Sequence, residues 1–207
     1  MSTPEFIHRF VPATEGSKRV LLLLHGTGGD ENDLLPIGRE LAPNAALLSP
    51  RGGVLENGMP RFFRRFAEGV FDEEDVIRRA NELADFIGTA ATKYEFASAD
   101  VTAVGYSNGA NIAAAMLLLR PEVLSRAILF RAMVPLSDPP APDLTGKRVL
   151  IASGSADPIM PIENAERLAA LLRERGAEAE LVVQPAGHGL IAQDIVAARQ
   201  WLARNRS

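Results

Sequence analysis

The sequence predicts an α/β fold in which a mainly parallel sheet carries helices on both faces. Short apolar runs alternate with longer segments of helical spacing along the whole chain, which is the pattern of repeated β–α units. The runs at 19–24, 127–130 and 148–153 are mostly apolar, as expected for strands buried on both faces. A length of 207 residues suits one such domain, which we expect to span 1–207.

The first half of the chain is expected to contain three strands. Residues 5–11 alternate loosely between apolar and polar side chains before Pro12, which is typical of an edge strand. The run at 19–24 is almost continuously apolar, and the run at 45–49 ends at Pro50. Both therefore predict buried strands.

Two helices are expected in the same half. Residues 33–41 follow an acidic cluster in which Asp30 or Asn32 could cap the helix. We interpret this cluster as a helix start rather than a metal site, because carboxylates are favourable at that end of a helix. Residues 72–93 keep apolar side chains at helical spacing, and Asp72 is placed to cap them.

The second half of the chain is predicted to contain further strands and helices. Apolar runs mark the strands, and a proline or a glycine follows two of the helices. The expected strands are 101–105, 127–130, 148–153 and 180–184, and the expected helices are 108–120, 162–175 and 191–203.

The sequence Gly105-Tyr106-Ser107-Asn108-Gly109 lies between an expected strand and an expected helix. A serine on so tight a turn has a strained backbone, and its hydroxyl is raised above the end of the sheet. Glycine two residues to either side avoids collisions in the turn. The N–H of Asn108, at the positive end of the helix, could then stabilise an oxyanion. The alternative is a plain turn bracketed by glycines, since so short a pattern also occurs by chance.

A second glycine-rich loop, from His25 to Gly29, directly follows a buried strand. Main-chain N–H groups of such a loop can face a ligand, and that of Thr27 is the expected second oxyanion donor. We expect Gly26 and Gly28 to border the substrate. His25 is interpreted as a brace for the loop rather than as a base. The alternative is a flexible turn between a strand and a helix.

Two further polar residues follow expected strands of the same sheet. Asp157 comes after 148–153, and His188 comes after 180–184, between two glycines. Because the carboxyl ends of parallel strands share one edge of a sheet, these residues and Ser107 should meet there. A serine hydroxyl needs a base within hydrogen-bond reach, and His188 would be that base, oriented by Asp157. The alternative for Asp157 is a local turn closed by its own carboxylate.

Residues 51–70 are expected to form a long loop with a turn at Asn57-Gly58. Its aromatic residues Phe62 and Phe63 could wall an acyl or aryl pocket beside Ser107, or they could cover the edge of the core. The full set of expected apolar pocket residues is Leu34, Phe62, Phe63, Ile159 and Met160.

Composition excludes several classes of function. The net charge is −4, so there is no basic field for nucleic acid or an anionic membrane. The chain has no cysteine, which excludes a disulfide framework, a thiolate metal site and a cysteine nucleophile. No apolar run could span a membrane, and the start at Met1 lacks the features of a signal peptide, so we expect a cytoplasmic protein without membrane insertion. We expect no metal and no cofactor.

These motifs resemble the α/β-hydrolase superfamily and, within it, the small phospholipase/carboxylesterase family. The order Ser107, Asp157, His188 is the order of the triad in that superfamily. The likeness to hydroquinone-resistance-type carboxylesterases, and more distantly to acyl-protein thioesterases, is carried by the stretches 24–33, 49–52, 105–111 and 187–189. The resemblance implies an α/β-hydrolase fold, these three residues as a catalytic triad, and Thr27 and Asn108 as oxyanion-hole donors.

We therefore expect a serine carboxylesterase that cleaves short-chain acyl or aryl esters through an acyl-enzyme intermediate. Acyl thioesterase and lysophospholipase activities use the same triad and stay open as alternatives. A different class of alternative is a ligand-binding protein that has this fold without turnover. The expected partner is a small-molecule ester rather than a nucleic acid, and a homodimer is consistent with the resembled families.

Overall fold

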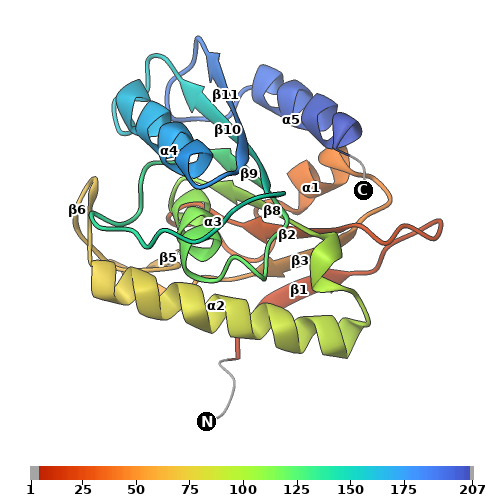
Figure 1. Ribbon diagram of the computed structural model, residues 1–207. Helices are drawn as coiled ribbons and strands as arrows, with labels where there is room; N and C mark the ends of the chain where they lie inside the picture. Colours follow the sequence, from red (N-terminus) through yellow and green to blue (C-terminus); the bar gives the residue numbers. More distant parts are fainter. Residues whose placement is uncertain (1–4, 206–207) are drawn as a thin grey trace.

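The computed structural model describes residues 5–205. One seven-stranded sheet runs through the molecule, and helices cover both of its faces (Figure 1). The predicted α/β class with a mainly parallel sheet is therefore confirmed. Residues 1–4, on which the expectation about an export signal partly depends, lie outside the described part of the chain.

The strands of this sheet lie in the order β1-β3-β2-β8-β9-β10-β11. Strand β1 pairs antiparallel with β3 at one edge, and the other pairings are parallel. Six strands therefore run in the same direction, and their carboxyl ends lie on one side of the molecule, where the sequence predicts the site. The strands are β1 (His8–Val11), β2 (Val20–Leu24), β3 (Ala46–Pro50), β8 (Val101–Tyr106), β9 (Arg126–Phe130), β10 (Arg148–Gly154) and β11 (Glu178–Gln184).

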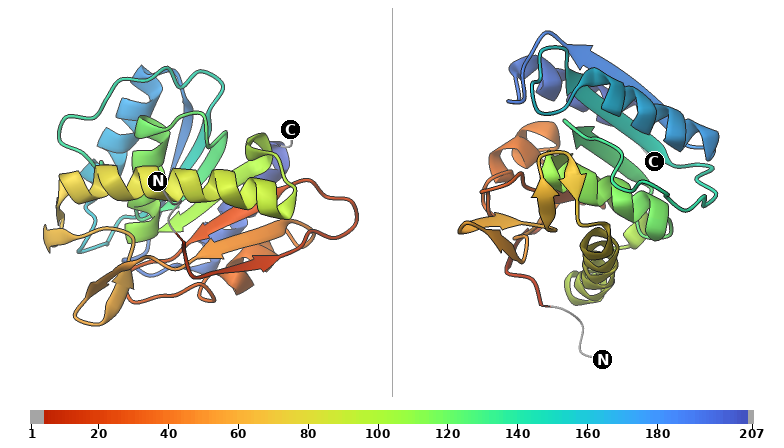
Figure 2. Two further views of the ribbon diagram at one scale, coloured as in Figure 1. Left: turned by 90° about the horizontal axis from the view of Figure 1, so that it is seen from below. Right: turned by 90° about the vertical axis from the view of Figure 1, so that its left-hand side faces the viewer.

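Helices pack on the two faces of the sheet as two separate groups (Figure 2). One face carries α2 (Glu73–Tyr94), α3 (Asn108–Leu119) and α4 (Ile162–Glu174). The other carries α1 (Leu35–Leu41) and α5 (Ala192–Arg204). Within residues 5–205, no helix is both long and apolar enough to cross a lipid bilayer.

The expected cap of the first helix is wrong. Helix α1 begins after Leu34, and no side chain in the described part of the chain caps it. Asp30 instead accepts a hydrogen bond from the main-chain N–H of Asn32 at 2.7 Å, which closes a turn before the helix starts. The cap of α2 is confirmed, because Asp72 accepts from the main-chain N–H of Asp75 at 3.2 Å.

The segment expected to be a long loop forms two short β-hairpins. Asn57 and Gly58 have φ values of 51° and 80°, and two positive values in succession are typical of the type I′ turn that suits a hairpin. The turn was predicted, but the strands beside it were not, because each is only two or three residues long. The hairpins are β4 (Val54–Glu56) with β5 (Met59–Arg61), and β6 (Arg65–Ala67) with β7 (Val70–Phe71).

Candidate active site

Ser107 lies in the turn between β8 and α3, and its backbone has φ 52° and ψ −113°. A positive φ is unfavourable for a residue with a side chain, so the turn is strained. The main-chain N–H of Ser107 donates to the carbonyl oxygen of Phe130 in β9 at 2.9 Å. The neighbouring strand therefore helps to hold the strained turn in place.

The two glycines of the Gly-x-Ser-x-Gly pattern lie where no side chain fits. A methyl group on Gly105 would lie 2.5 Å from the carbonyl oxygen of Gly109. A methyl group on Gly109 would lie 2.0 Å from the carbonyl oxygen of Leu24, at the end of β2. The close approach of α3 to the sheet therefore requires both glycines.

The structure brings together the three residues predicted to form the triad. Nε2 of His188 lies 3.0 Å from Oγ of Ser107, and Nδ1 of His188 lies 2.8 Å from Oδ2 of Asp157. Since a carboxylate can only accept, Nδ1 carries the proton and Nε2 is free to accept one from the serine. The imidazole is partly exposed, whereas the carboxylate side chain is fully buried.

The second oxygen of Asp157 makes local bonds. Oδ1 accepts from the main-chain N–H groups of Ile159 at 2.8 Å and Met160 at 3.0 Å. The turn offered as the alternative for Asp157 is therefore present, and the other oxygen makes the contact with His188 that an orienting acid requires. The turn fixes the carboxylate in the direction that the imidazole needs.

The N–H groups of Thr27 and Asn108 meet the first requirement of oxyanion donors. Within residues 5–205, neither donates a hydrogen bond to a protein acceptor. The N–H of Asn108 belongs to the first residue of α3, where a helix supplies no acceptor. Next to Thr27, the N–H of Gly28 is already bonded to the carbonyl oxygen of Pro60 at 3.0 Å.

Comparison with known proteins identifies the family. Residues 7–205 match the model of the Phospholipase/Carboxylesterase family. The chain belongs to this family. Hydrolase MhqD of Bacillus subtilis (strain 168) is 51% identical over 185 residues, which are 89% of this chain and 92% of that protein.

Two solved structures are similar to this family member over most of its length. A carboxylesterase from Bacillus cereus has a TM-score of 0.94 and 46% identity, with 96% of this chain and 94% of that one covered. A carboxylesterase from Mesorhizobium loti has a TM-score of 0.92 and 36% identity, with the same 96% and 94% covered. The α/β-hydrolase fold predicted from the sequence is confirmed, and so is the resemblance to carboxylesterases.

His25 braces the glycine-rich loop of this family member, as the sequence indicates. Its side chain is buried, with Nδ1 donating to the carbonyl oxygen of Gly26 at 2.7 Å and Nε2 accepting from the main-chain N–H of Gly52 at 2.9 Å. Burial lowers the pKa of His25, which keeps the imidazole neutral. Arg61, which the sequence analysis missed, donates to Oγ1 of Thr27 at 2.6 Å and fixes the same loop from the hairpin.

The predicted pocket residues lie close to the core. Leu34, Phe62, Phe63 and Met160 are buried, and Ile159 is half-buried. Phe63 has no exposed surface, so it covers the edge of the core, and this does not exclude a place in the wall of a pocket. A role of these five residues in a substrate pocket stays a prediction.

Asn108 links α3 to the segment that carries Phe62. Its Oδ1 accepts from the main-chain N–H of Phe62 at 2.7 Å. Its Nδ2 is buried and has no partner within the described residues. The side chain thus anchors the hairpin region, a contact that no local pattern in the sequence indicates.

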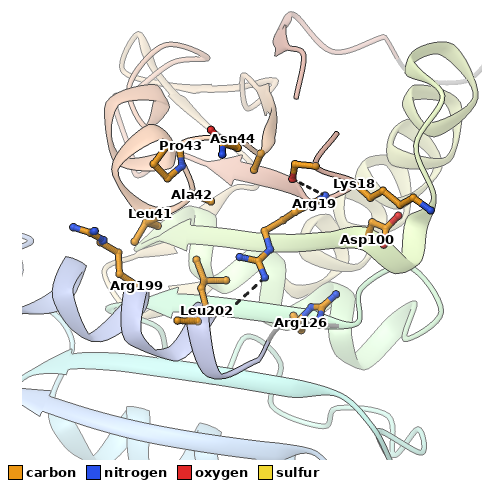
Figure 3. Close-up of a pocket in the computed structure, with 13 residues that line it drawn as sticks. Lys18, Arg19, Leu41, Ala42, Pro43, Asn44, Asp100, Arg126, Arg199 and Leu202 are labelled. Carbon is orange, nitrogen blue, oxygen red and sulfur yellow. Dashed lines mark hydrogen bonds between the residues drawn. The ribbon is translucent and has the colours of Figure 1, made fainter. Parts of the chain in front are cut away.

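A hollow of about 560 Å³ lies at the amino ends of the parallel strands, opposite the carboxyl ends that Ser107 follows (Figure 3). It lies beside the first residues of β2 and β9, whereas Ser107 follows the last residue of β8. This hollow is therefore separate from the candidate site at Ser107. Its lining residues are Ser17, Lys18, Arg19, Leu41, Ala42, Pro43, Asn44, Ala45, Asp100, Arg126, Arg199, Leu202 and Ala203.

Proposed function

We propose that the protein is a serine carboxylesterase that cleaves short-chain acyl or aryl esters through an acyl-enzyme intermediate. The observation that carries the proposal is the pair of hydrogen bonds that join Asp157 to His188 and His188 to Ser107, at 2.8 Å and 3.0 Å. A serine becomes nucleophilic when a neighbouring base accepts its proton, and this geometry supplies such a base.

In the first half of the reaction, Oγ of Ser107 attacks the ester carbonyl carbon while Nε2 of His188 takes the hydroxyl proton. The carbonyl oxygen becomes an oxyanion that accepts hydrogen bonds from the N–H groups of Thr27 and Asn108. When the C–O bond to the leaving group breaks, His188 gives its proton to the departing alkoxide. An alcohol leaves, and the acyl group stays on Ser107 as an ester.

In the second half, water replaces the alcohol. His188 takes a proton from water as the oxygen attacks the acyl carbon, and the same two N–H groups stabilise the second oxyanion. The bond to Oγ then breaks, Ser107 recovers its proton from His188, and a carboxylic acid is released. Asp157 remains ionised throughout and stabilises the imidazolium form.

The similar solved proteins favour esters over other acyl substrates. Two of them are carboxylesterases from bacteria, at 46% and 36% identity. The same triad chemistry would also cleave thioesters and lysophospholipids, so a substrate panel decides the leaving group. We expect the highest kcat/KM for p-nitrophenyl esters of short acids, ahead of acyl-CoA thioesters and lysophospholipids.

Substituting Ser107 with alanine tests the proposal. Ser107→Ala should lower kcat for p-nitrophenyl acetate by about 10⁶-fold, because the substitution removes the nucleophile. Circular dichroism should show an unchanged fold, since among the described residues the serine side chain hydrogen-bonds only to His188. Turnover by Ser107→Ala close to that of the wild type would contradict the proposal.

A further inference from the structure

A buried arginine outside the proposed triad contacts the loop that carries His188. Arg131 follows β9, has no exposed surface and has a positive φ of 58°. Its main-chain N–H donates to the carbonyl oxygen of Ala152 at 2.9 Å, so the neighbouring strand β10 fixes its backbone. A fully buried cation is unfavourable unless it is paired and hydrogen-bonded.

Asp194, in the first turn of α5, supplies the opposite charge. Nη2 of Arg131 lies 2.6 Å from Oδ2, and Nη1 lies 3.2 Å from Oδ1, so the pair is bidentate, and both side chains are fully buried. Oδ2 also accepts from the main-chain N–H of Ile191 at 3.0 Å. Nη1 of Arg131 also donates to the carbonyl oxygen of Ala152 in β10 at 3.1 Å. The carboxylate is therefore tied to the start of α5, and the guanidinium is held in one orientation.

Three further donor hydrogen bonds of this cluster reach three successive carbonyl groups of the loop that carries His188. Nε of Arg131 donates to the carbonyl oxygen of Gly187 at 3.0 Å, and Nη2 donates to that of Gly189 at 2.9 Å. The phenol of Tyr106 donates to the carbonyl oxygen of His188 at 3.1 Å. Burial raises the pKa of Tyr106, which keeps this hydroxyl protonated as a donor.

We propose that Arg131, oriented by Asp194, and Tyr106 are positioning residues that hold the imidazole of His188 against Ser107. The proposal rests on the proposed function, in which this imidazole is the base. The loop has a glycine on each side of the histidine, and the three carbonyl bonds remove the freedom that these glycines would otherwise give it. A displacement of about 1 Å at a reacting group can lower the rate by about 100-fold, so such bonds matter for turnover.

If the Arg131–Asp194 pair only stabilised the fold, replacing it would change stability and leave turnover unchanged. Removing one partner of a buried ion pair is strongly destabilising, but replacing both with apolar side chains of similar volume is often neutral or stabilising. The double variant Arg131→Met/Asp194→Leu removes both charges together, and with them the bonds to the loop carbonyls. It therefore separates the stability of the fold from the placement of His188.

We expect the double variant to fold, with a melting temperature at or above that of the wild type. Its kcat for p-nitrophenyl acetate should fall by about 100-fold while KM stays near the wild-type value, because a displaced base slows the chemistry rather than binding. The proton NMR signal of Nδ1–H of His188, shifted downfield by its bond to Asp157, should weaken or disappear. A stable double variant with wild-type kcat and an intact signal would overturn the proposal.

Arg126 offers a matched control. It is also a buried arginine that donates to main-chain carbonyls, those of Asn205 at 3.1 Å and Ala99 at 3.4 Å. However, it is the first residue of β9 and lies beside the hollow at the amino ends of the strands, away from His188 (Figure 3). Arg126→Met should lower the melting temperature without changing kcat or the His188 signal. An equal loss of kcat in this control would show that any buried arginine affects turnover, which would also overturn the proposal.

Two single variants keep the test decisive if the double variant does not fold. Arg131→Lys keeps a charge opposite Asp194, but one ammonium cannot replace the fork that reaches two loop carbonyls. Tyr106→Phe removes the bond to the carbonyl of His188 and leaves the ion pair intact. Both should lower kcat and weaken the His188 signal, and wild-type values in both would overturn the proposal.

Failure of the proposed function would be recognised separately. In that case the wild type itself would hydrolyse no ester, whereas the NMR comparison needs no substrate. A downfield signal that is present in the wild type and lost in the Arg131 variants would still support the positioning role.

Discussion

Ser107 has a backbone conformation that its neighbours must stabilise. A non-glycine residue at such angles is strained by roughly 1–3 kcal/mol. The compensation is local. The N–H of Ser107 donates a hydrogen bond to β9, and the helix that follows is buried from Asn108 to Leu118. The strain persists because a well-packed helix and a central strand both meet at this residue.

His25 makes the stability of the fold depend on pH. Burial lowers its pKa in the folded state, so the unfolded chain takes up the proton first as the pH falls. The stability that neutral His25 provides is present above the ordinary value of about 6.5 and is lost as the pH falls from there through the folded value. In the protonated form, Nε2 could no longer accept from the N–H of Gly52.

The variant His25→Gln isolates this effect, because its amide oxygen can accept the same bond without titrating. We expect the free energy of unfolding in urea to fall more for the wild type than for the variant between about pH 7.5 and about pH 5.5. Acidic side chains titrate in both proteins, so the difference between them reports on His25. Equal losses in the two proteins would contradict this assignment.

At the scale of elements, the contact between α3 and β2 depends on Gly109, which has no side chain. Gly109→Ala would place a methyl group 2.0 Å from a main-chain oxygen of β2, so the helix must shift. We expect this variant to lose about 1–3 kcal/mol of stability, together with much of its esterase activity. Gly88→Ala is the matched control, since Gly88 lies inside α2 with nothing within 4 Å of an added methyl group.

The control should behave in the opposite way. Gly88→Ala should raise the free energy of unfolding by about 0.5–1 kcal/mol, because alanine is the better helix former. Its activity should equal that of the wild type. Thermal or urea unfolding with p-nitrophenyl acetate assays checks both variants, and an unchanged Gly109→Ala enzyme would refute the close-packing argument.

Elements with strong periodicity could be predicted, whereas elements set by contacts could not. Helix α2 combines helical spacing with the Asp72 cap, and both were visible in the sequence. The sequence does not predict the start of the first helix correctly, because the side chain of Asp30 closes a turn instead of capping α1. The sequence does not predict the hairpins at 54–71, because their strands are too short to show alternation. Asn57-Gly58 predicts only the turn of the first hairpin.

At the scale of the whole molecule, parallel topology explains why the sequence could predict that the three candidate residues meet. Ser107, Asp157 and His188 each follow a strand, and the carboxyl ends of six parallel strands lie on the same side of the molecule. Arg131 also follows a buried strand, so the same signal was available for it. Its partner Asp194 lies in the first turn of a helix, where a carboxylate is ordinary, so their pairing emerges only when α5 packs on the sheet.

One sheet supports both groups of helices, so the two faces should unfold together. Trp201, the only tryptophan in the chain, belongs to α5 and is buried against the face of the sheet opposite α2 and α3. Its fluorescence and the far-ultraviolet circular dichroism of all helices should therefore change at the same urea concentration. Two separate transitions would contradict the prediction of a single domain.

The central claim is that Ser107 is a nucleophile activated by His188. The most direct measurement is labelling of the folded protein by a fluorophosphonate, with the modified residue identified by peptide mass spectrometry. We expect a single adduct on Ser107, formed rapidly in the wild type, far more slowly in His188→Ala and not at all in Ser107→Ala. An unlabelled Ser107 in the folded wild type, or equal labelling in His188→Ala, would contradict it.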